Sequence, residues 1–107
     1  MERFVELFNQ GKYFDAHEHL EEIWLELEGQ DKAWTQGLIQ IAALMHLISL
    51  DRWAGAKKVY DRAAKNLAGA PAQFNGIKLE LLWSQITNIV QNQLQKADAD
   101  VKIAFDQ

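Results

Sequence analysis

Apolar residues recur every three or four positions along most of the chain, which is the spacing of one face of a helix. Glycine is sparse and Pro71 is the only proline, so few residues interrupt this pattern. The pattern predicts five helices, at 2–9, 13–28, 31–50, 53–68 and from Asn75 or Gly76 to Lys96. Residues 97–107 are predicted to form a further short helix or a frayed tail.

The predicted helices differ in how their apolar residues are distributed. The helices at 53–68 and 76–96 each have one apolar and one polar face, which is typical of helices that cover a core. The apolar residues of the helix at 31–50 point in every direction, which indicates a central, buried helix. A faint repeat between 12–20 (KYFDAHEHL) and 52–60 (RWAGAKKVY) favours helical hairpins. We therefore expect an all-α fold, a compact single-domain bundle of about five antiparallel helices.

Composition narrows the classes of function. The chain has 107 residues, enough for one domain, which we expect to span 1–107. Six carboxylates lie between Asp15 and Glu28 with no lysine or arginine among them, and the net charge is -4. Such a field repels phosphate backbones, so nucleic acid is not an expected partner. The sequence shows no membrane span, no signal peptide and no cysteine, so we expect a cytoplasmic protein.

A polar cluster is predicted where the second and third helices meet. His17 and Glu21 are four residues apart on the edge of the apolar face, and Trp24 lies one turn further on. In the central helix, Gln36 and Gln40 share a face, and a buried amide without a partner costs roughly 1–3 kcal/mol. These amides are therefore predicted to face His17 and Glu21, whereas His46 points elsewhere and is assigned to another contact. Gly37 would allow close approach of the second helix or leave room for a ligand.

Several interpretations of this cluster remain open. A histidine and a glutamate at this spacing suit a metal, but the second histidine of a zinc-protease pattern is missing and no second pair follows. We therefore predict no metal and no cofactor. A hydrogen-bond network that joins two helices is one alternative, and a binding site is another. Glu18, Glu22 and Glu26 form an exposed acidic face whose repulsion a basic partner would relieve. Trp34, Trp53 and Trp83 are expected to anchor the core.

Three sequence blocks carry a family resemblance. They are FNQGKYFDAHEHLEEIW at 8–24, QGLIQIAA at 36–43 and GA at 55–56. In this order the blocks resemble the family known as domain of unknown function 309. The resemblance implies a compact all-α fold of antiparallel helices and implies no activity. The positions that carry the family pattern coincide with the predicted cluster: His17, Glu18, Glu21, Trp24, Gln36, Gly37 and Gln40.

The cluster supports a binding function over catalysis, because no complete catalytic set is present. We expect a non-enzymatic binding or interaction module for a protein or small-molecule ligand, with candidate binding residues His17, Glu18, Glu21, Trp24, Gln36 and Gln40. The alternative is a small hydrolase-like or metal-assisted enzyme. In that case His17 would act as a general base oriented by Glu21, and Gln40 would position the substrate.

Overall fold

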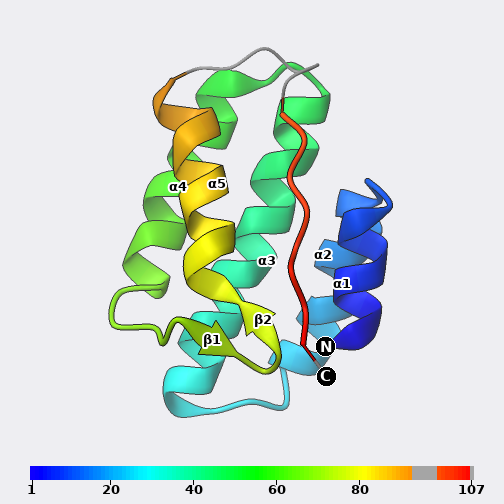
Figure 1. Ribbon diagram of the computed structural model, residues 1–107, viewed down its shortest axis with the longest axis vertical. Helices are drawn as coiled ribbons and strands as arrows, with labels where there is room; N and C mark the ends of the chain where they lie inside the picture. Colours follow the sequence, from blue (N-terminus) through cyan, green and yellow to red (C-terminus); the bar gives the residue numbers. More distant parts are fainter. Residues whose placement is uncertain (93–98, 107) are drawn as a thin grey trace.

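The fold is a bundle of helices with one small hairpin (Figure 1). The computed structural model describes residues 1–92 and 99–106. Along the chain the elements are α1 (Glu2–Asn9), α2 (Tyr13–Trp24), α3 (Gly29–Ser49), α4 (Trp53–Asn66), β1 (Gln73–Phe74), β2 (Ile77–Lys78) and α5 (Leu79–Gln91). The predicted all-α bundle is confirmed, with a two-residue strand pair added to it. Within the described residues, every helix is too short or too polar to cross a membrane.

Helix α3 occupies the centre of the bundle, with α4 on one side and α2 and α1 on the other (Figure 1). Its buried apolar residues cover most of its circumference: Leu38, Ile39, Ile41, Ala42, Leu44, Met45 and Ile48. This confirms the central helix that the sequence predicted. Trp34, Trp53 and Trp83 are partly buried and pack against the core from its periphery, also as expected.

The connection between α2 and α3 differs from the prediction. Helix α2 ends at Trp24 instead of Glu28, and α3 begins at Gly29 instead of after Asp31. The helix ends early because Glu26 N–H donates to the carbonyl of Ile23, three residues back, and Glu28 is extended (φ -139°, ψ 162°). Such short i→i-3 bonds close a helix instead of continuing it.

The start of the last helix was predicted wrongly. Instead of a helix from Asn75 or Gly76, β1 and β2 form an antiparallel hairpin in which Phe74 pairs with Ile77, and α5 begins only at Leu79. Asn75 (φ 50°) and Gly76 (φ 84°) occupy the two turn positions. A two-residue hairpin turn of type I′ has positive φ at both positions, a conformation that asparagine and glycine tolerate best. Residues 93–96 of the predicted helix lie outside the described residues.

The C-terminal segment is neither a helix nor a frayed tail in its described part. Residues 99–106 run extended between α1 and α5, across the front of α3 in Figure 1. Val101 and Ile103 are buried, and Ile77 forms a β-bridge with Phe105. The apolar residues at alternate positions fit a strand that covers a core on one side. The prediction for 97, 98 and 107 falls outside the described residues.

Candidate functional site

Helix α2 separates an apolar face from an acidic face. Ala16 and Leu20 are fully buried against the core. The residues of the acidic face, Asp15, Glu18 and Glu22, are exposed, as predicted, and Glu26, which lies beyond the end of the helix, is exposed as well. At the boundary, Nε2 of His17 lies 3.1 Å from a carboxylate oxygen of Glu21, so the predicted pair is formed. Glu21 is half-exposed and His17 is mostly covered.

A surface hollow opens beside this pair, between α2 and α3. It encloses about 230 Å³, is almost entirely apolar, and is lined by Phe14, His17, Ala43, His46 and Leu47. We call it the α2–α3 hollow. The Phe14 ring centre lies 5.9 Å from that of His17 and 5.4 Å from that of His46. Phe14 is 49% exposed although it is a large apolar side chain, so the hollow has an aromatic wall open to solvent.

Of the five residues that line this hollow, only His17 was predicted as a site residue, and the two other ring-bearing residues were missed. His46 was assigned to a different contact, and Phe14 was not placed in the site. Both can be recognised by helical spacing, because Phe14 lies three residues before His17 and His46 lies three residues after Ala43. The structure therefore brings two histidines and a phenylalanine together from two helices.

The contacts of His17 limit what its imidazole can do. Nε2 faces the Glu21 carboxylate, while Nδ1 is buried and has no hydrogen-bond partner among the described residues. A neutral ring that donates from Nε2 carries its lone pair on Nδ1. A general base needs that lone pair within reach of a substrate proton. A lone pair on Nδ1 would lie beneath the surface in this arrangement.

The predicted contact between His17 and Gln40 is not made. Instead Oε1 of Gln40 accepts a hydrogen bond from Nδ2 of Asn66 at 2.8 Å, which joins α3 to α4. Gln36 lies one turn earlier and is half-buried. The prediction that Gln40 faces the second helix was therefore wrong, because a helical wheel does not show which neighbouring helix a side chain meets.

Gly37 also serves the α3–α4 contact. A Cβ atom at this position would lie 2.5 Å from Cγ of Leu67, directly after α4. The glycine therefore admits the end of α4, not α2 as expected, and its space is filled by a side chain of the protein instead of being left for a ligand.

The side chain of Trp24 contacts the start of α3 and so stabilises the connection between α2 and α3. Its indole Nε1 donates to the carbonyl of Lys32 at 3.1 Å, and the Lys32 ammonium lies 4.4 Å from the centre of a Trp24 ring. Both contacts tie the end of α2 to the first turns of α3. Of the predicted site residues, His17 and Glu21 thus lie together, with Glu18 on the adjacent acidic face, whereas Trp24 and Gln40 make contacts elsewhere.

Metal-ligating side chains do not converge in the described part of the chain. No group of three or more histidines, aspartates or glutamates is placed there to hold an ion. What the α2–α3 hollow offers chemically is apolar and aromatic surface, with carboxylates on the neighbouring turns of α2.

Comparison with known proteins places the chain in a family. Residues 1–59, more than half of the chain, match the family described as Domain of unknown function (DUF309). The chain belongs to this family. It is also 32% identical, over 73 residues, to an uncharacterized protein of Aquifex aeolicus (strain VF5). That match covers 67% of this chain but only 22% of the relative, so the chain corresponds to a minor part of that longer protein. All the residues that line the α2–α3 hollow fall within the matched range 1–59.

Proposed function

We propose that this DUF309 domain is a non-enzymatic protein-binding module. The α2–α3 hollow receives one bulky apolar side chain of the partner, and the acidic face of α2 attracts basic residues that flank it. One observation carries this proposal: half-exposed Phe14 forms the wall of an apolar hollow directly beside a helix face that bears carboxylates and no lysine or arginine.

The size of the hollow favours a protein side chain over a free small molecule. Its volume of about 230 Å³ is below the range of roughly 300–1,000 Å³ that is usual for small-molecule sites. It suits a single apolar side chain, since protein interfaces are commonly anchored by a few such residues in shallow pockets. Aromatic residues such as Phe14 are enriched at such interfaces.

The charge of α2 defines the remainder of the partner. Glu18 and Glu22 are four residues apart on α2 and are exposed, so they repel one another along the helix, and exposed Glu26 follows just beyond the helix end. Lysine or arginine residues of a partner would remove this repulsion and would also accelerate association. The expected ligand is therefore a basic segment with one large apolar residue, bound more weakly as the salt concentration rises.

Selection from a random peptide library tests this proposal, because such a library makes no assumption about the partner. We expect peptides selected on the wild-type protein to combine an aromatic or aliphatic residue with lysine or arginine. Phe14→Ser should weaken the selected peptides at least tenfold. Leu81→Ser is the matched control, because Leu81 is equally exposed at 50% but lies on α5. Selected peptides without basic residues, or equal binding to the Phe14→Ser variant, would contradict the proposal.

The hydrolase-like alternative retains one supporting observation. The His17–Glu21 pair, with its 3.1 Å contact, borders a hollow that is open to solvent. An enzyme that used this pair would lose turnover of small ester or amide substrates in His17→Gln while still binding them. A binding module would show no His17-dependent turnover on the same panel of substrates, so this single measurement separates the two functions.

A further inference from the structure

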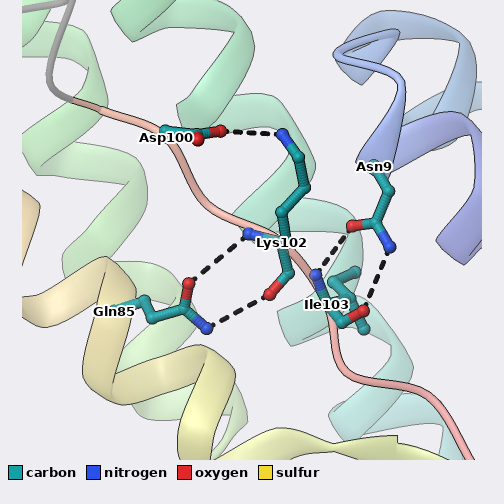
Figure 2. Close-up of polar contacts among 5 residues, drawn as sticks. All are labelled: Asn9, Gln85, Asp100, Lys102 and Ile103. Carbon is teal, nitrogen blue, oxygen red and sulfur yellow. Dashed lines mark hydrogen bonds and ion pairs between the residues drawn. The ribbon is translucent and has the colours of Figure 1, made fainter.

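The described C-terminal residues 99–106, here called the tail segment, are held by hydrogen bonds to their backbone as well as by buried side chains. Asn9 of α1 donates from Nδ2 to the carbonyl of Ile103 (3.0 Å) and accepts from its N–H (2.7 Å). Gln85 of α5 does the same for Lys102, with distances of 3.2 Å and 3.4 Å. Figure 2 shows the two side-chain amides on opposite sides of the segment.

This arrangement follows from the geometry of an extended chain. Successive residues of a strand direct their N–H and C=O groups to opposite sides, so Lys102 faces α5 while Ile103 faces α1 (Figure 2). Each amide satisfies both backbone groups of one residue, as a neighbouring strand would. The two amides therefore recognise an extended backbone whatever side chains it carries.

Strand β2 completes the contact beyond Ile103. Lys78 N–H donates to the carbonyl of Ala104 (3.0 Å), and Asp106 N–H donates to the carbonyl of Gly76 (2.7 Å), so the segment lies antiparallel beside β2 and forms one β-bridge with it. A Cβ atom on Gly76 would collide with the carbonyl oxygen of Asp106 and with the Phe105 ring. Glycine at this turn thus keeps the end of the groove open.

Side-chain contacts with the core occur at alternate positions, with Ala99 and Phe105 partly buried at the two ends. Val101 is fully buried and Ile103 nearly so, at 4% exposure. Lys102 between them is exposed, and its ammonium bonds to Asp100 of the same segment. Backbone pairing combined with pockets for alternate side chains is the mode by which peptides bind when they add a strand to a sheet.

From these contacts we propose that α1, α5 and β2 form a peptide-binding groove, the tail groove. Its ligand is an extended segment of another protein with apolar residues at alternate positions, and the tail segment is a built-in occupant that competes with that ligand. The proposal uses none of the residues of the α2–α3 hollow, so it is independent of the function proposed above.

A cleavable form of the full chain tests this. A protease site is inserted between Asn92 and Ala99, the purified protein is cut, and a fluorescent peptide of residues 99–106 (ADVKIAFD) is titrated while its anisotropy is measured. We expect saturable binding to the cut protein, at least tenfold tighter than to the uncut protein, whose own segment occupies the groove. The peptide ADSKSAFD, which lacks the two apolar side chains, should bind at least tenfold more weakly.

Uncut Ile103→Ser protein provides a second measurement that does not depend on cleavage. Its weakened segment should admit the ADVKIAFD peptide, and the peptide should raise its melting temperature while leaving that of the wild type unchanged. When Asn9→Ala is added to the Ile103→Ser protein, its affinity for the ADVKIAFD peptide should fall at least tenfold. Absence of binding by both the cut protein and the Ile103→Ser variant would show that the segment is an integral part of the core, and would overturn the proposal.

Discussion

Substitution of Gly37 by alanine tests the packing of α3 against the end of α4. The added Cβ would lie 2.5 Å from Cγ and 2.6 Å from Cδ2 of Leu67. Because Cγ is the branch point of that side chain, a rotation of its methyl groups cannot relieve the overlap. Either the whole Leu67 side chain or the end of α4 must move.

Two opposing contributions determine how Gly37→Ala changes the free energy of unfolding. Alanine is favoured over glycine inside a helix by about 1 kcal/mol. Forcing a methyl group into a packed site costs about 1–3 kcal/mol. The free energy of unfolding of Gly37→Ala should therefore fall by up to about 2 kcal/mol, and each kcal/mol corresponds to about 4–8 °C in melting temperature for a domain of this size. In a Leu67→Ala background the obstacle is absent, so the same substitution should stabilise by about 1 kcal/mol.

Urea denaturation followed by tryptophan fluorescence measures this change of sign. Gly55→Ala in α4 is the matched control, because its Cβ would meet Cδ1 of Leu47 at an ordinary 3.5 Å. That control should gain about 0.4–1 kcal/mol. If Gly37→Ala stabilised the wild type as much as the Leu67→Ala variant, the close packing of α3 on Leu67 would be refuted.

Three further predictions concern polar groups that are buried or partly buried. The Thr35 hydroxyl is buried with no hydrogen-bond partner among the described residues, so Thr35→Val should raise the free energy of unfolding by about 1 kcal/mol in thermal melts; a loss would reveal a partner. A double-mutant cycle of Gln40→Ala and Asn66→Ala should give a coupling of about 0.5–1.5 kcal/mol, and zero coupling would contradict their bond. Burial raises the pKa of Tyr13 above 10.0, which favours its protonated form in the folded state. Wild-type stability should therefore fall relative to Tyr13→Phe as pH rises past 10.0, measured by urea titration, whereas a constant difference would count against this burial effect.

Local patterns predicted the parts of the fold that depend on local physics. The all-round apolar sequence of α3 was sufficient to predict its central position, because such a helix has no face suited to water. The His17–Glu21 pair was also predictable from local structure, because four-residue spacing brings two side chains together on any helix.

The hairpin was missed although the sequence contains a signal for it. Asn75 and Gly76 stand between Phe74 and Ile77, and an Asn-Gly pair between apolar residues is a strong indication of a two-residue turn. The helical periodicity of α5 was extended backward across this pair. Turn chemistry should therefore have outweighed periodicity at this point.

The polar partners of Gln40 and of the tail segment could not be predicted from local patterns. Asn9 and Ile103 are 94 positions apart, and Gln40 and Asn66 are 26 apart. A helical wheel gives the direction of an amide but not the element that it meets. Each of these amides found its partner only through the packing of the whole chain.

The two proposed binding surfaces differ in how many of their residues lie within the range that matches the family. The α2–α3 hollow lies wholly within residues 1–59, whereas the tail groove combines Asn9 from that range with Gln85 and a tail segment beyond it. Because all residues that line the hollow lie in the matched range, the hollow is the stronger candidate for a function common to DUF309 proteins. Should Phe14→Ser leave peptide selection unchanged while ADVKIAFD still binds the cut protein, the function would belong to the tail groove, outside what the family match alone defines.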